Sequence, residues 1–234
     1  MRDRVRQSAP APPAADDRVR ELIDAIDEQR GKREPGVVVA LRERVADQVE
    51  LNMLMNQMKE VEEPVLKRRI GEQIREKQRQ FHASNGGGHS TPAWIIPTMD
   101  ACVAITLGDA HAALNRDRAA LAQARNNWQR AISLANISDS LREMGRYAEA
   151  VRPALQAIAA DPLYLSGWCY LTMALWKSGR GEAAAEILRT VPAMDDVNKP
   201  SSVWRSYLTS YNEFGEMRHA LPEAQHLFSI VGAA

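Results

Sequence analysis

The sequence contains little cysteine, and this scarcity excludes a scaffold held together by disulfides. Its two cysteines, Cys102 and Cys169, lie far apart in unlike contexts. They provide neither a disulfide framework nor the paired spacing that binds a structural zinc ion. Such a chain fits a reducing compartment best, so we expect a cytoplasmic protein.

The sequence also lacks long apolar runs and an excess of either charge. Uninterrupted apolar stretches are no longer than the one from Val37 to Leu41, whereas a membrane helix requires about 20 residues. No apolar run follows the amino-terminal arginines, so export through a signal peptide is not expected. The 30 basic and 30 acidic residues balance, which removes the long-range field that draws a whole molecule to nucleic acid. We expect a soluble protein that binds neither membrane nor nucleic acid.

Proline and glycine divide the chain into segments of different character. Residues 1–15 form a Pro/Ala-rich flexible tail, and residues 16–82 contain amphipathic helices that are expected to form a hairpin. A Gly/Pro linker at 83–98 precedes helices in 99–130, and a repeated pattern occupies 131–234. Because 45% of the residues are hydrophobic, the chain can bury a sizeable core. The expected fold class is all-α.

Glycines and alanines recur at a regular spacing in the carboxyl-terminal half. A shift of 34 residues places Gly145 on Gly179, and a further shift of 36 reaches Gly215. The same shifts align three alanines and three large residues that start the units. The alanines are Ala150, Ala184 and Ala220, and the large residues are Leu134, Trp168 and Trp204.

This spacing predicts that each unit is a pair of helices. A glycine suits the left-handed residue just past the first helix, and a small alanine lets the second helix approach closely. The pattern resembles the tetratricopeptide repeat family, whose unit has about 34 residues. The resemblance implies a stack of helical hairpins, an α-solenoid, with units at 131–164, 165–200 and 201–234. Whether residues 99–130 form a fourth, degenerate unit stays open, because the segment lies directly before the repeats but no glycine or alanine in it falls into the register.

The resemblance also implies a function and a binding surface. In the family, the first helices line a concave groove that binds a peptide or helix of a partner, so we expect a non-catalytic protein-protein interaction module, an adaptor or scaffold. Asp139 would repel the carboxylate tail that one subset of the family binds. Trp176, Lys177 and Arg205 instead suit a segment with apolar and acidic residues. The implied groove positions are Asp139, Arg142, Cys169, Met173, Trp176, Lys177, Arg205, Thr209 and Asn212.

Other patterns give only weak signals for metal binding, phosphate binding or catalysis. Histidines such as His82 and His89 have no spacing typical of a metal site, and the glycines at 86–88 lack the lysine of a phosphate-binding loop. We therefore expect no metal, no cofactor and no enzymatic activity. The alternative is a nucleic-acid-associated or assembly-scaffold protein. In it, the basic helix at 67–79 binds nucleic acid and the repeats serve for oligomerisation. Interleaved glutamates favour a solvated, salt-bridged face instead.

The end of the chain carries apolar residues that the sequence leaves without a cover. A helix from about Pro222 to Val231 is followed by three small residues, although repeat stacks normally finish with a polar capping helix. If exposed together, its apolar side chains would form an association surface. We expect a homodimer through this surface, and the alternative is a fold-back of helices from the first half. The residues concerned are Leu227, Phe228, Ile230 and Val231.

Overall fold

The computed structural model describes residues 94–232 and, before them, residues 63, 65–66, 68–74 and 76. This part of the chain is all-helical and contains no strand. The residues described among 65–76 are helical, and Ile70 and Ile74 are buried there. The tail predicted at 1–15 and most of the segments predicted between it and residue 94 lie outside the described residues.

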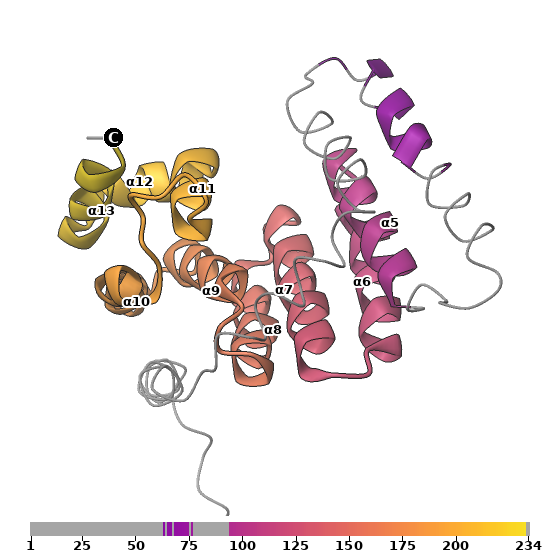
Figure 1. Cartoon of the computed structure of the whole chain (residues 1–234), viewed down its shortest axis with the longest axis horizontal. Helices are drawn as coiled ribbons and strands as arrows, with labels where there is room; N and C mark the ends of the chain where they lie inside the picture. Colours follow the sequence, from indigo (N-terminus) through magenta and orange to yellow (C-terminus); the bar gives the residue numbers. More distant parts are fainter. Residues whose placement is uncertain (1–62, 64, 67, 75, 77–93, 233–234) are drawn as a thin grey trace, which may run out of the picture.

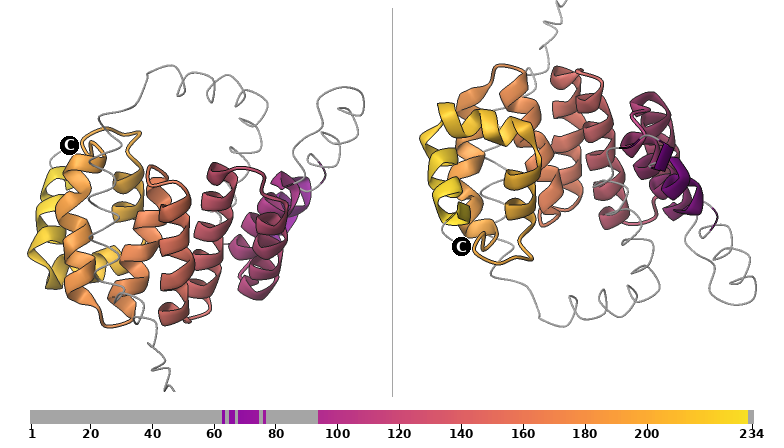
Figure 2. Two further views of the ribbon diagram at one scale, coloured as in Figure 1. Left: turned by 90° about the horizontal axis from the view of Figure 1, so that it is seen from below. Right: turned by 90° about the horizontal axis from the view of Figure 1, so that it is seen from above.

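From residue 95 onward, the described chain forms a succession of helices (Figure 1). From α5 to α10 each helix packs against the next, and α7 also contacts α9. Figure 2 shows the helices side by side from α5 at one end to α13 at the other. No helix in this part is both long and apolar enough to cross a bilayer. The helices are α5 (Ile95–Thr106), α6 (Ala110–Gln123), α7 (Asn127–Glu143), α8 (Tyr147–Ala160), α9 (Leu165–Lys177), α10 (Gly181–Met194), α11 (Val203–Ser210), α12 (Asn212–Ala220) and α13 (Pro222–Gly232).

The α7–α8 and α9–α10 hairpins close with the same turn. Gly145 and Gly179 follow the first helix of each hairpin with positive φ values of 72° and 81°. The amide of each glycine donates to the carbonyl three residues earlier, at 2.8 and 3.0 Å, and the next amide donates to the carbonyl five residues earlier, at 2.9 Å in both. This pair of bonds is the Schellman motif, which satisfies free carbonyls at a helix end. The predicted role of these two glycines is confirmed.

A third hairpin, α5–α6, has the same turn although it lies outside the predicted register. Gly108 has a φ of 81°, and its amide and the next one donate to the carbonyls three and five residues earlier, at 3.0 and 2.9 Å. Ala113 follows it by five positions and is fully buried, as Ala150 is after Gly145. Gly108 precedes Gly145 by 37 positions, mainly because α7 has 17 residues and α9 has 13. A fixed shift therefore misses this hairpin, whose first helix begins inside the predicted linker at 83–98.

The last unit departs from the predicted two-helix design. Gly215 lies inside α12 rather than in a left-handed turn, and Ala220 ends this helix instead of lying early in a second one. Two breaks in the backbone explain the difference. Tyr211 is extended (φ −115°, ψ 128°) between α11 and α12, and Leu221 is extended (φ −119°, ψ 123°) because a proline follows it. Three short helices therefore replace the hairpin predicted at 201–234.

Small residues bring neighbouring helices into close contact. Ala150 and Ala184 are fully buried, and Ser138 on α7 donates to the carbonyl of Ala150 on α8 at 2.9 Å. A methyl group at Gly167 on α9 would meet Ile158 on α8 at 3.4 Å, so these two helices also lie close together. Such contacts fix α7 and α9 relative to each other, and both helices contribute to the site described below.

Helix α13 buries part of the apolar surface that was predicted to be exposed. Leu227 is 1% exposed and Val231 is 7% exposed, because α13 packs against α10 and α12. Phe228 and Ile230 are partly buried against the same core. The prediction that all four residues form an exposed association surface is therefore wrong for Leu227 and Val231. The homodimer stays a prediction, and it now rests on Phe228 and Ile230 alone.

Candidate functional site

A buried arginine links the middle of the stack to its carboxyl-terminal end. Arg142 lies in the last turn of α7 and is 7% exposed. Its guanidinium donates to Asp139 at 2.8 Å, to Glu213 at 2.6 Å and to Glu143. Burial alone would lower the pKa of Arg142, but the charges of Asp139 and Glu213 outweigh burial and raise this pKa above its ordinary value. Arg142 therefore stays charged and ties α12 to α7.

Three tyrosines, Tyr170, Tyr207 and Tyr211, pack beside this arginine and form a tyrosine cluster. Tyr170 on α9 meets Tyr207 edge-on at 5.4 Å and Tyr211 edge-on at 6.5 Å, and Tyr207 stacks on Tyr211 at 4.9 Å. The Arg142 guanidinium lies 5.1 Å from the centre of the Tyr211 ring, within the range of a cation–π contact. Burial raises the pKa of all three hydroxyls. The cluster is therefore neutral and offers hydrogen-bond donors and acceptors.

Asp117 is a carboxyl group on the otherwise apolar buried face of α6. Only 1% of its surface is exposed. The Ser140 hydroxyl donates to its Oδ2 at 2.9 Å, while its Oδ1 has no hydrogen-bond partner in the part of the chain that the structure describes. Burial raises the pKa of Asp117 to about 7; the hydrogen bond from Ser140 and the neighbouring Asn136 amide act in the opposite direction, and repulsion from Asp139 adds to the rise.

Asp117, Asp139 and two members of the tyrosine cluster border a cavity of about 120 Å³. Its lining comes from α5, α6, α7 and α9 and from Tyr211, which lies between α11 and α12. Its α5 side includes Cys102 and Ile105. Among the described residues that line it, none is a lysine, arginine or histidine. The cavity therefore presents carboxyl and hydroxyl groups without a cation of its own.

Two of the predicted groove positions belong to this site, and two others are wrong. Asp139 lines the cavity and Arg142 holds Asp139 in place. Cys169 and Met173 are fully buried, since α7, α8, α10, α11 and α12 all contact α9. Burial also raises the pKa of the Cys169 thiol. Both side chains belong to the core, because residues 167–175 of α9 are buried without interruption.

The other predicted groove positions do not line the cavity. Trp176 Nε1 and Lys177 Nζ both donate to Glu216, at 3.1 and 2.9 Å. Arg205 donates to three backbone carbonyls at 3.3 to 3.4 Å. The charge of Lys177 is therefore paired with a carboxylate of the same chain, whereas these hydrogen bonds join Arg205 to neutral carbonyls. The two exposed positions are Thr209 and Asn212.

The sequence pattern used for the groove misses Asp117, Tyr170 and Tyr211. A signal for Asp117 is present, since it falls on the apolar stripe of its helix and a buried carboxyl group requires a partner or a proton. The two tyrosines give no comparable signal. An alignment of units shows which positions are equivalent, but it does not show which side chains meet between α9 and the α11–α12 connection.

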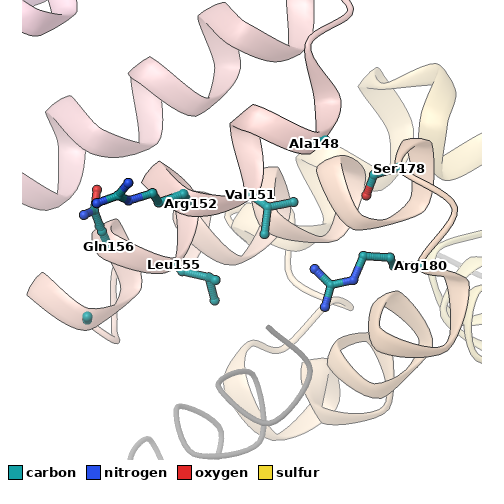
Figure 3. A pocket seen from close by; sticks show the side chains of 8 residues that line it. Ala148, Val151, Arg152, Leu155, Gln156, Ser178 and Arg180 are labelled. Atoms are coloured by element: carbon teal, nitrogen blue, oxygen red, sulfur yellow. The ribbon is translucent and has the colours of Figure 1, made fainter. Parts of the chain in front are cut away.

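A larger and more open depression lies on α8. Its volume is about 530 Å³, and its lining combines residues of α8 with Ser178 and Arg180 from the α9–α10 turn. Figure 3 shows Val151 and Leu155 between Arg152 on one side and Arg180 on the other. It contains none of the predicted groove positions, and none of its described lining residues is acidic.

No protein-family model matches this chain, and no curated protein matches its sequence. Among the described residues, no three His, Cys, Asp or Glu side chains are placed to share a metal ion. His82 and His89 lie outside the described residues, as do four basic residues of the alternative nucleic-acid site. These four are Lys67, Arg75, Lys77 and Arg79.

Proposed function

We propose that this chain is a non-catalytic protein-binding module built from tetratricopeptide-like helical hairpins. Three consecutive hairpins in the described chain have a Schellman turn at a glycine with positive φ. A fully buried alanine follows each of these glycines by five positions; these are Ala113, Ala150 and Ala184. The first helices also contact one another, α5 with α7 and α7 with α9. These features support a stack in which the first helices share one face.

The cavity of about 120 Å³ is the observation that carries this proposal. Each of the first helices α5, α7 and α9 contributes to its lining, so a ligand there would contact three hairpins at once. Clefts with a few converging polar groups are the common form of binding sites. A segment of a partner protein that crosses α5, α7 and α9 would place one side chain in the cavity.

The contacts of the basic residues favour a different partner chemistry from the one implied by the resemblance. Lys177 already pairs with Glu216 at 2.9 Å, and Arg205 already bonds backbone carbonyls. The charge of Lys177 is therefore already paired within the chain, and Arg205 does not line the cavity. The carboxyl groups of Asp117 and Asp139 favour a segment that donates hydrogen bonds.

A selection from a peptide display library, carried out with the full chain, tests the proposed function. Asn136 lines the cavity on α7, so Asn136→Arg fills it with a long side chain. Gln225→Arg adds the same charge to the exposed surface of α13, away from both hollows, and serves as the control. We expect selected segments to bind the wild type and Gln225→Arg equally. Asn136→Arg should bind them about tenfold more weakly or worse, a loss of at least roughly 1.4 kcal/mol.

Calorimetry measures these affinities, and circular dichroism verifies that both variants stay helical. The proposal is contradicted if no segment is selected. It is also contradicted if a folded Asn136→Arg variant binds every selected segment as tightly as the wild type does, because the cavity would then have no part in binding.

A further inference from the structure

Asp117 has an unused hydrogen-bond acceptor at the cavity. The side chain is 1% exposed, and its Oδ2 accepts from Ser140 at 2.9 Å. Its Oδ1 has no partner among the described residues, although Asp117 lines the cavity. A buried acceptor without a donor loses the hydrogen bonds that it makes to water in the unfolded chain. This oxygen therefore indicates a place for a donor that enters from outside the chain.

We infer that this cavity is a binding site for an alkylammonium group, such as the end of a lysine side chain. The inference rests on the proposed function only in so far as a partner segment carries the lysine. The site itself can be tested with a simple amine.

The charges around the cavity favour a cation. Asp117 and Asp139 line it, and Glu143 and Glu213 bond Arg142 close by. Arg142 thus offsets only part of this negative charge, and its guanidinium does not belong to the cavity lining. An anion would meet repulsion from these groups, whereas an ammonium group would add the missing positive charge.

The shape of the lining also fits an ammonium group with a short alkyl chain. The rings of Tyr170 and Tyr211 are nearly perpendicular, with an interplanar angle of 89° and centroids 6.5 Å apart. The hydroxyl-bearing rings of both tyrosines line the cavity, and Ile105 on α5 provides apolar surface for the last methylene groups. The cavity of about 120 Å³ is several times larger than the roughly 10–15 Å³ that one water requires. It therefore has room for more than a single bridging water.

A competing explanation is that Asp117 keeps a proton and is a purely structural neutral acid. Burial raises the pKa of Asp117 to about 7, so the charged and neutral forms are nearly balanced at neutral pH. An ammonium group would favour the charged form and would lower this pKa, whereas a purely structural acid has no response to amines. The two explanations therefore predict different results in one titration.

Carbon-detected NMR on the full chain, with n-butylammonium chloride as the probe, makes this distinction. The control ligand is n-butanol at the same chloride concentration, because it has the same chain without the charge. We expect saturable changes at Asp117, Tyr170 and Tyr211 with the amine only. Saturation should lower the pKa of Asp117 by about one to three pH units, the usual effect of an adjacent opposite charge.

Two variants locate the effect. Asp117→Asn keeps the shape of the side chain but removes its charge, so we expect the amine to bind about tenfold more weakly or worse. Glu182→Gln removes an exposed carboxyl group on α10 and should bind the amine as the wild type does. If Asp117→Asn does not fold, the pKa change in the wild type decides alone. An Asp117 pKa that is the same with and without saturating amine overturns the inference.

Two forms of the amine distinguish its source. A short peptide with one lysine and blocked ends represents a partner segment, and free n-butylammonium represents a small metabolite. Binding of both is the expected result. If n-butylammonium binds and the peptide does not, the lysine assignment is overturned and the cavity is a site for a small-molecule amine. If neither binds while the display selection still succeeds, the ammonium site is wrong and the proposed function stands.

Discussion

Arg142 on α7 and Glu213 on α12 are 71 residues apart in the sequence, yet their side chains meet at 2.6 Å. Both are buried, and Arg142 also bonds Asp139 at the edge of the cavity. The carboxyl-terminal helices are therefore tied to the wall of the cavity by a charge pair rather than by apolar packing alone. This pair also fixes the neighbouring Tyr211, whose ring lies against the Arg142 guanidinium.

Replacing Arg142 should strongly destabilise the fold. Arg142→Met leaves Asp139 and Glu213 buried without their cation, and breaking a buried pair in this way typically costs about 3–5 kcal/mol. The free energy of unfolding, measured by urea denaturation, tests this. Arg146→Met is the matched control, because Arg146 pairs with Glu149 at the surface. Its effect should be much smaller, and equal losses in both variants would contradict the assigned role of Arg142.

Alanine substitutions at two glycines should change stability in opposite directions. Gly145 has a φ of 72°, so Gly145→Ala should cost about 1–2 kcal/mol. Gly215 lies inside α12, and a methyl group there would have open space around it, so Gly215→Ala should stabilise the protein by about 0.5–1 kcal/mol. Urea denaturation measures both. A destabilising Gly215→Ala would instead support the left-handed turn that the sequence register predicts there.

Much of the central architecture could be predicted from the sequence, because helix ends follow local rules. Gly145 and Gly179 mark two turns correctly, since only the residue itself and its nearest carbonyls determine the left-handed position. Gly108 forms the same turn, but the 17 residues of α7 displace it from the fixed spacing. Gly215 fits the predicted spacing but lies inside a helix instead of a left-handed turn, because the extended residues Tyr211 and Leu221 divide its unit into short helices.

The candidate site was harder to predict, because it depends on contacts between distant helices. Cys169 and Met173 occupy positions that the family resemblance assigns to the groove, yet five other helices contact α9 and both side chains are buried. The sequence pattern predicts Asp139, which lines the cavity, but it does not predict Asp117. A periodic pattern shows which face of a helix is apolar, but it does not show how many neighbours cover that helix.

Ala150 should not tolerate a large side chain. It is fully buried, and the Ser138 hydroxyl reaches its carbonyl at 2.9 Å across the α7–α8 contact. Ala150→Leu should cost about 1–3 kcal/mol, the usual effect of overpacking. Ala148→Leu places the same side chain at an exposed position of the same helix and is the control. Thermal unfolding followed by circular dichroism compares them, and a fully stable Ala150→Leu would argue against close packing here.

The stability difference between the wild type and Asp117→Asn should depend on pH. Burial raises the pKa of Asp117 from 3.8 to about 7, so between these values the folded chain binds a proton that the unfolded chain has lost. The contribution of Asp117 to the free energy of unfolding is therefore fully present below about pH 4, and it is lost as pH rises through 7. Because one pKa unit corresponds to about 1.4 kcal/mol, the wild type should lose up to about 4 kcal/mol relative to Asp117→Asn between pH 4 and pH 8.

The pKa of Asp139 is raised by burial as well, but that residue is present in both proteins and its effect largely cancels. Urea denaturation of the two proteins at several pH values, in buffers without amines, gives the difference directly. A difference that stays constant from pH 4 to pH 8 would show that Asp117 does not titrate in this range.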